Sequence, residues 1–162
     1  MLIRKAESTD IPLISRLANE IWWPTYSGVL SDEQITFMLE KIYSVEALQS
    51  QIAEGITFLI VESDAVPVGF AAYSLKERGN LVYKVEKLYV LPSEQGKGTG
   101  RKLIAEIAKI VKALGAKTLE LNVNRGNKAF HFYKKLGFEV YKTVDIPYHD
   151  YVLNDYIMRI SL

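Results

Sequence analysis

A short apolar segment that runs directly into a glycine-rich turn is the feature that most constrains the fold of this chain. Leu88–Leu91 has the composition of a buried strand and ends at Pro92; three glycines at alternate positions and a long amphipathic segment follow. Glycine lets backbone N–H groups approach a bulky anion closely because it has no Cβ. The start of the next helix adds unpaired amides and the positive end of its dipole. The segment therefore predicts a strand–turn–helix unit that binds a phosphate or pyrophosphate group.

The spacing of the glycines excludes two common nucleotide-binding motifs. A phosphate loop of the kinase or ATPase type ends in Gly-Lys-Ser/Thr, which this turn lacks. A dinucleotide-binding turn requires Gly-x-Gly-x-x-Gly, and Arg101 stands where its last glycine would follow Gly96 and Gly98. The pattern that does fit is Gln95-x-x-Gly98-x-Gly100, which resembles the acetyl-coenzyme A signature of the GNAT superfamily of N-acetyltransferases.

The resemblance implies that acetyl-CoA is the co-substrate and that this turn binds it. Amides of the turn would hold the pyrophosphate, and the exposed backbone of the preceding strand would pair with the pantetheine arm as an added strand does. The cofactor-binding residues that it implies here are Leu88, Tyr89, Val90, Gln95, Gly96, Lys97, Gly98, Thr99, Gly100 and Arg101.

A second segment, Asn124–Phe138, resembles a later motif of the same family, in which an asparagine and an alanine precede a tyrosine-bearing helix and Gly-Phe. Asn127 is expected to cap a helix that runs from Asn127 to Leu136. The resemblance adds that an asparagine here bonds the pantetheine arm. Because its position varies within the family, Asn122 and Asn124 remain candidates beside Asn127, which is favoured.

Two residues are candidates for the chemistry. The resemblance makes Tyr133 the general acid that protonates the departing thiolate, and a phenol is chemically suited to that task; the alternative is a core aromatic with a solvated hydroxyl. Glu86, on the strand that enters the turn, is the best-placed carboxylate for a general base. It could instead form a surface ion pair with Lys84 or Lys87, and a chain of water molecules could replace a dedicated base.

The acceptor side carries no motif. Trp22, Trp23 and Tyr26 lie between the first two expected helices, a region that forms the acceptor wall in GNAT enzymes, and these three are the candidate substrate-binding residues. Adjacent tryptophans cannot both face one core, so one of them is expected to line a pocket. The C-terminal stretch is acidic and rich in tyrosine, which suits a cationic amine as well as a solvated loop, and the chain has a general similarity to the spermidine-type branch. Its residues are Asp145, Tyr148, Asp150, Tyr151, Asp155 and Tyr156.

Composition excludes several classes of function. The formal charge of +1 argues against a nucleic-acid binder. The absence of cysteine excludes thiol catalysis and disulfides, and His131 and His149 lie too far apart in sequence for a metal-ligand pair, so no metal is expected. No stretch has the length of a membrane span or the apolar core of a signal peptide, so the expected location is the cytoplasm, away from membranes.

The order of elements predicts an α/β fold in one domain over residues 1–162. Three helices precede a strand-rich region, and the glycine turn joins a strand to a crossover helix and then to a second, parallel strand. Antiparallel hairpins on either side give a mixed twisted sheet flanked by helices, and the order resembles the GNAT fold over the whole chain. The resemblance implies that the central strands splay around acyl-CoA. The last strand is a candidate for pairing across a homodimer.

The leading hypothesis is an N-acetyltransferase that moves the acetyl group of acetyl-CoA directly to a primary amine in a ternary complex. A small-molecule acceptor such as a polyamine is favoured. The absence of cysteine agrees with a route that has no acyl-enzyme. The alternatives are a protein or peptide N-acetyltransferase and a non-catalytic acyl-CoA-binding regulator.

Overall fold

The computed structural model describes residues 1–162, which form two compact units. Unit 1 consists of Met1–Ser74 and Glu86–Glu106, and unit 2 consists of Leu75–Val85 and Ile107–Leu162. None of the helices is both long and apolar enough to cross a membrane.

The chain contains seven strands and five α-helices, with short 3-10 helices at Ser8–Asp10 and Pro92–Glu94. The hydrogen-bonded strand order is β1-β2-β3-β4-β5-β7-β6. In chain order the elements are β1 (Leu2–Lys5), α1 (Ile11–Tyr26), α2 (Asp32–Tyr43), α3 (Val45–Ala53), β2 (Thr57–Ser63), β3 (Val66–Glu77), β4 (Val82–Val90), α4 (Thr99–Ala113), β5 (Thr118–Asn124), α5 (Ala129–Leu136), β6 (Glu139–Tyr148) and β7 (Tyr151–Ser161).

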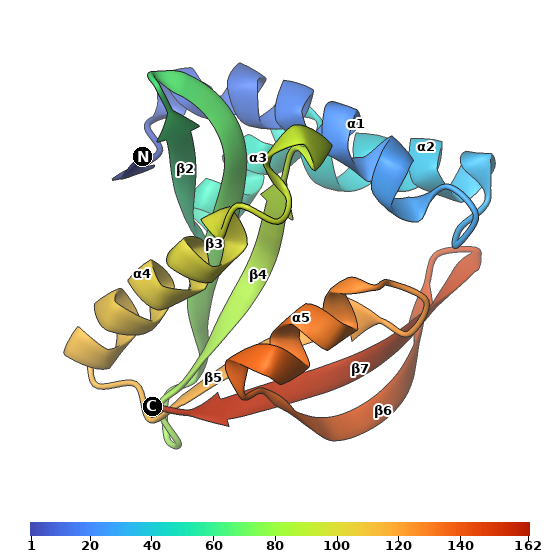
Figure 1. Ribbon diagram of the computed structural model, residues 1–162. Coiled ribbons are helices and arrows are strands. Elements are labelled where there is room, and N and C mark those ends of the chain that lie inside the picture. Colours follow the sequence, from blue (N-terminus) through green and yellow to red (C-terminus); the bar gives the residue numbers. More distant parts are fainter. The chain divides into compact units, whose positions relative to one another are not determined.

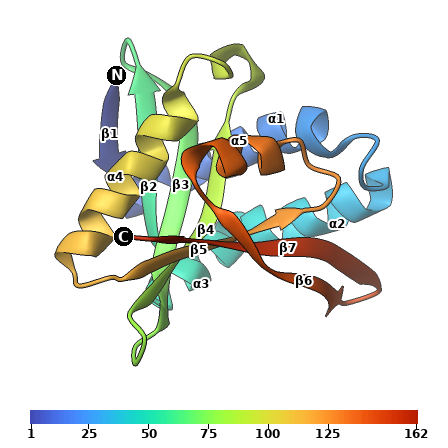
Figure 2. The same ribbon diagram turned by 60° about the horizontal axis from the view of Figure 1, so that its bottom comes forward.

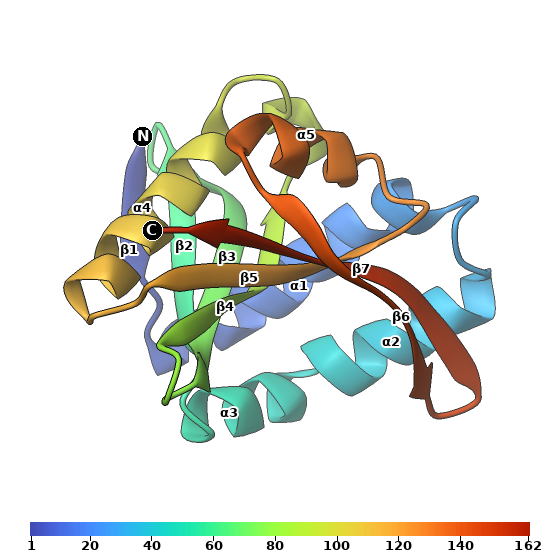
Figure 3. The ribbon, with the colours of Figure 1, turned by 90° about the horizontal axis from the view of Figure 1, so that it is seen from below.

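Unit 1 is built from helices whose apolar faces are buried together with the faces of β2 and β3. Side chains at helical spacing on α1, such as Ile14 and Leu17, are at most 1% exposed, and Ile35 of α2 and Leu48 of α3 are fully buried. The hydroxyl of Ser31 accepts a hydrogen bond from Gln34 N, which fixes the start of α2. Figures 1 and 3 show α3 on one side of β2 and β3 and the first turns of α4 on the other.

Unit 2 contains the parallel strand pair that the glycine turn and its crossover helix predict. β4 pairs with β5 in parallel, from Val82↔Thr118 to Val85↔Leu121, whereas β5–β7 and β7–β6 are antiparallel. Figures 1 and 2 show α5 lying beside β5 and β7. Its buried Tyr133 and the nearby Phe138 add to a core with Leu121 and Val123. The mixed α/β architecture predicted from the sequence is confirmed.

The last strand is not available for pairing with a second copy, so that expectation is wrong. β7 is bonded on one edge by β5 and on the other by β6, because the chain turns back at Tyr148–Tyr151 and β7 inserts beside β5. β6 is the strand at this end of the order, and it carries the exposed side chains of Val140 and Tyr141.

A buried carboxylate anchors three strands of unit 2. Glu120 on β5 has a side chain that is 1% exposed, and it accepts hydrogen bonds from Lys76 on β3 and, at 2.9 Å, from Arg159 on β7. Burial by itself would raise the pKa of Glu120, but the hydrogen bonds and charges of Lys76 and Arg159 outweigh it, and the net pKa is lowered. The charged form is therefore the one that stabilises the folded state.

Glu120→Gln is expected to lower the free energy of unfolding by about 2 to 4 kcal/mol at pH 7, because two cations lose their buried partner. Since the folded pKa lies below the ordinary value, the stabilisation is present above about pH 4.5 and is lost as the pH falls through the folded pKa. Urea denaturation of both proteins from pH 7 to pH 3 measures this difference. Glu77→Gln is the matched control: this carboxylate is 40% exposed and 3.8 Å from Arg159, so its loss should cost under about 1 kcal/mol. Equal losses in both variants would contradict the assignment.

Candidate functional site

The glycine turn in unit 1 connects the end of β4 to the start of α4. After Val90 the chain forms the 3-10 turn at Pro92–Glu94, and α4 begins at Thr99. Gly96 and Gly98 have φ values of +81° and +82°, a left-handed conformation that L side chains rarely adopt. A Cβ built on either of them would meet nothing within 4 Å, so the backbone conformation, rather than crowding, requires glycine here.

Several polar groups of this turn have no partner within the chain. The hydrogen bond from Lys102 N to Gly98 O, at 3.1 Å, is the first of α4, so the amides of Thr99, Gly100 and Arg101 precede the helical ladder and have no acceptor. Thr99 is 1% exposed, and its Oγ1 is buried without a hydrogen bond. A buried hydroxyl beside unpaired amides at a helix start fits an anionic ligand with several oxygen acceptors, such as a pyrophosphate.

The strand that leads into the turn is held closely against β3. The amide of Leu91 donates to Val68 O at 2.8 Å, and a Cβ on Gly69 would lie 2.7 Å from Tyr89 O. Gly69 is therefore required for the backbone of β3 to approach Tyr89. The sequence analysis did not single out Gly69, although an isolated glycine within a strand pattern is the usual signal of such an approach.

The three aromatic candidates on α1 have two different environments. Trp22 and Tyr26, 3% and 7% exposed, pack together with ring centroids 4.5 Å apart, and both rings contact Tyr89 of β4. The hydroxyls of Tyr26 and Tyr89 are 2.9 Å apart. This cluster fixes the Tyr89 side chain from the α1 side, so packing accounts for the burial of Trp22.

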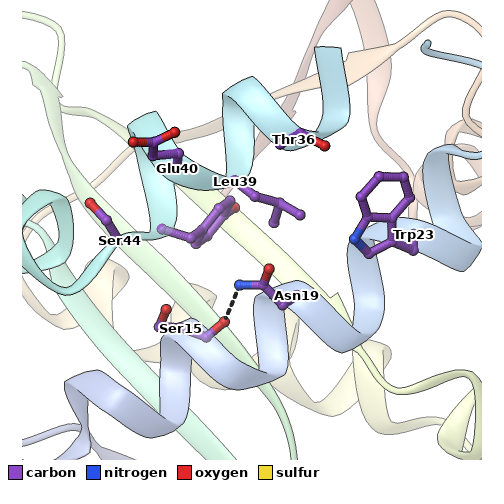
Figure 4. A pocket seen from close by; sticks show the side chains of 8 residues that line it. Ser15, Asn19, Trp23, Thr36, Leu39, Glu40 and Ser44 are labelled. Carbon is purple, nitrogen blue, oxygen red and sulfur yellow. Dashed lines mark hydrogen bonds between the residues drawn. The ribbon is translucent and has the colours of Figure 1, made fainter. Parts of the chain in front are cut away.

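Trp23 points away from that cluster. It lines a pocket of about 280 Å³ between α1 and α2 together with Asn19, Thr36 and Glu40 (Figure 4). Asn19 Nδ2 is bonded to Ser15 O at 2.9 Å, which fixes the amide at the pocket wall. The prediction that one of the two adjacent tryptophans faces a pocket is confirmed by this placement.

Glu86 is the first residue of β4 that belongs to unit 1. Its Oε1 accepts a hydrogen bond of 2.7 Å from Ser74 Oγ on β3, so a neighbouring strand sets the orientation of the carboxylate. A carboxylate fixed in this way is suited to accept a proton from a donor on its other side, because the side chain needs no reorganisation.

The three asparagine candidates lie in unit 2, and they differ in which of their side-chain atoms already form hydrogen bonds. Asn127 Oδ1 accepts a hydrogen bond from Ala129 N at 2.9 Å. Because α5 begins at Ala129, the predicted start of this helix at Asn127 is two residues too early. Asn127 nevertheless binds the first amide of α5. Asn124 Oδ1 accepts from Gly126 N at 2.8 Å. Asn122 donates to Asp155 Oδ2 at 3.3 Å, and its Oδ1 is buried without a partner, which suits an incoming amide N–H.

Tyr133 lies on α5 and is 7% exposed. Its ring packs against Phe132 and Phe138, at centroid distances of 5.1 and 5.8 Å, so the ring has the core position that helical spacing predicts. Gly137, with φ +103°, ends the helix behind it as expected.

Residues 26–146 match the model of the acetyltransferase (GNAT) domain. The chain belongs to the GNAT acetyltransferase family. This acetyltransferase is 33% identical over 149 residues to the spermidine N(1)-acetyltransferase of Thermoplasma acidophilum, an alignment that covers 87% of the chain and 89% of that protein. It is 27% identical over 150 residues to the L-amino acid N-acyltransferase MnaT of Escherichia coli, covering 91% and 83%.

The fold of this acetyltransferase agrees with solved structures. The PaiA N-acetyltransferase from Thermoplasma acidophilum, in complex with coenzyme A, superposes with a TM-score of 0.86 at 30% identity, covering 99% of this chain and 98% of that one. A GCN5-related N-acetyltransferase from Rhodopseudomonas palustris has a TM-score of 0.83 at 22% identity, covering 99% and 95%, and shows likeness of fold alone. The GNAT resemblance stated from the sequence is thereby confirmed.

Proposed function

We propose that the protein transfers the acetyl group of acetyl-CoA directly to a primary amine in a ternary complex, with a polyamine-like small molecule as the favoured acceptor. The observation that carries the proposal is the buried, unpartnered Thr99 Oγ1 beside the unpaired amides of the GNAT turn, which suits the coenzyme pyrophosphate. The name of the Thermoplasma acidophilum relative supports spermidine as the first acceptor to test.

The residues proposed to bind acetyl-CoA fall into two groups. The turn amides, with Gln95 and Lys97 beside them, would hold the pyrophosphate, and the backbone of Leu88–Val90 would pair with the pantetheine arm. Asn122 supports this assignment through its buried, unpartnered Oδ1, which can accept a hydrogen bond from a pantetheine amide. Asn127 keeps the N–H groups of its side chain to donate to a pantetheine carbonyl.

The proposed chemistry uses one acid and one base. Acetyl-CoA supplies an activated acetyl thioester. Glu86 takes a proton from the amine, directly or through water, so that the nitrogen lone pair can form the new C–N bond. Tyr133 donates its phenolic proton to the sulfur as the C–S bond breaks, and the products are the N-acetyl amine and coenzyme A. Of the acceptor-side candidates, Tyr26 is proposed to contact the amine, with Trp22 supporting it by packing, whereas Trp23 faces the separate pocket between α1 and α2.

An acceptor panel tests the proposal. Purified protein is mixed with acetyl-CoA and with spermidine, 1,5-diaminopentane, amino acids or short peptides, and release of the coenzyme thiol is followed. The expected result is thiol release that depends on a small amine, with the N-acetyl product identified by mass spectrometry. Release with peptides alone would favour a protein N-acetyltransferase. Binding of acetyl-CoA with no release by any amine would favour a regulator.

Glu86→Gln is expected to lower kcat about 100-fold at pH 7, because the amide cannot accept the proton. Ser74→Ala, which removes only the 2.7 Å hydrogen bond to Glu86, should lower kcat by a smaller factor, about threefold to tenfold. The KM for acetyl-CoA should stay constant in both. An unchanged kcat in Glu86→Gln would instead favour a water chain without a dedicated base.

A further inference from the structure

The pocket between α1 and α2 contains none of the residues proposed to bind acetyl-CoA or to transfer a proton, and all of its lining residues belong to unit 1. Asn19 and Trp23 lie four residues apart on α1 and share one face of it. Thr36 and Glu40 do the same on α2, across the pocket (Figure 4). The volume of about 280 Å³ is close to the lower limit of about 300 Å³ for small-molecule sites, so the pocket suits a small molecule.

Glu40 is the only charged residue that lines the pocket. Its carboxylate forms no ion pair with a lysine or an arginine within 4.0 Å. Lys41, the next residue, lies over the Phe37 ring instead, with its Nζ 5.8 Å from the ring centroid. A carboxylate without a paired cation attracts a positively charged ligand and repels an anion. The charge of the pocket therefore favours a cation.

The groups beside Glu40 fit an organic cation better than a metal ion. Trp23 is partly exposed in the pocket, and the indole ring is the side chain that attracts ammonium groups most strongly through its face. Asn19 Nδ2 is held by the 2.9 Å hydrogen bond to Ser15 O, so the amide presents its Oδ1 as an acceptor (Figure 4). A single carboxylate is a poor site for an ion such as Ca²⁺, which is normally bound by several oxygen ligands with carboxylates among them.

Tyr43 separates the pocket from β4. It lines the pocket, and its ring packs against Tyr89 of β4 at a centroid distance of 6.3 Å and against Trp22 at 5.5 Å. Tyr89 belongs to the strand proposed to pair with the pantetheine arm. A ligand in the pocket therefore contacts Tyr43 and not the backbone of β4, so the pocket is a second site beside that of the coenzyme.

We propose that the pocket between α1 and α2 binds a small organic ammonium ion, with Glu40 compensating its charge and Trp23 contacting its apolar groups. The assignment rests on the residues of the pocket and does not require that the protein acetylate an amine. A quaternary ammonium ion is a suitable probe, because it is attracted to an aromatic ring and has no N–H that acetyl transfer could replace.

The test titrates choline into the protein in a calorimeter with no acetyl-CoA present. The comparison ligand is 3,3-dimethylbutan-1-ol, the neutral counterpart of choline with carbon in place of nitrogen. The expected result is saturable binding of choline to one site, with binding of the neutral alcohol at least about tenfold weaker. Raising the ionic strength should weaken the binding of choline, because Glu40 is exposed and its charge is screened. Equal affinity for the two ligands, or no saturable binding of choline, would overturn the proposal.

Two variants identify the groups that bind the cation. Glu40→Gln should weaken choline binding about threefold or more and leave binding of the neutral alcohol unchanged, since it removes only the charge. Trp23→Leu should weaken choline binding about threefold to tenfold. Glu54→Gln is the matched control: this carboxylate is exposed at the end of α3 and does not line the pocket, so the variant should bind choline as the wild type does. The same affinity in Glu40→Gln as in Glu54→Gln would contradict the assignment.

Glu86→Gln keeps this pocket distinct from the proposed site of acetyl transfer. The variant should bind choline as the wild type does, because Glu86 does not line the pocket. If Glu86→Gln lost the binding and Glu40→Gln kept it, choline would occupy the acceptor site and the inference would be overturned. The acceptor panel decides acetyl transfer separately: failure of every amine to release the thiol would sink the proposed function and leave choline binding at Glu40 intact.

Discussion

Gly98→Ala is expected to raise the KM for acetyl-CoA about tenfold or more and to leave the KM for the amine within about twofold. The φ of +82° is costly for an L side chain, so the turn must shift and the amides that follow it move with it. These are the amides proposed to hold the pyrophosphate, and the effect should therefore fall on the coenzyme. Initial-rate kinetics with each substrate varied in turn measures both constants.

Gly115→Ala is the matched control for the strain itself. Gly115 follows α4, has a φ of +98° and would meet nothing within 4 Å with a Cβ, as is true of Gly98. Both variants should lose about 1 kcal/mol of stability. Only Gly98→Ala should change the KM for acetyl-CoA. The same change of KM in both variants would mean that the turn acts through stability and not through binding.

Tyr133→Phe is expected to lower kcat about 100-fold or more with little change in the affinity for coenzyme A, because the variant lacks the proton proposed for the leaving thiolate. The ring contacts with Phe132 and Phe138 do not involve the hydroxyl, so the core should remain packed. Single-turnover thiol release gives the rate, and titration with coenzyme A gives the affinity.

Tyr141→Phe serves as the control for loss of a phenol. The Tyr141 ring stacks on Arg159, 3.8 Å from the guanidinium carbon to the ring centroid, and phenylalanine preserves that contact. Its kcat should match the wild type. If Tyr133→Phe also kept full turnover, Tyr133 would be a packing residue, the alternative that helical spacing allows.

The glycine turn and the Asn124–Phe138 segment could be recognised from the sequence because their signals are local. The turn needs glycine where φ is positive, and the strand and helix around it have their own periodicities. The same is true of Gly137 after α5. The start of α5 was misplaced because Asn127 bonds the Ala129 amide from just outside the helix, a geometry that residue spacing does not distinguish from a helix cap.

Other features depend on residues far apart in the chain. Tyr26 meets Tyr89 across 63 residues, and Asn122 meets Asp155 across 33. The position of β7 between β5 and β6 likewise follows from strand pairing, which no local pattern specifies, and it removed the expected pairing of the last strand with a second copy.

By itself the sequence determined the family, the order of helices and strands, and the turn proposed to bind the acetyl donor. These features depend on the backbone conformation of a few residues and on the spacing of apolar residues along the chain, which are properties of neighbouring residues. Only the tertiary structure distinguished Trp23, which lines a pocket, from the buried Trp22. Burial decides that difference, and it depends on which side chains the fold brings within a few ångströms of each other.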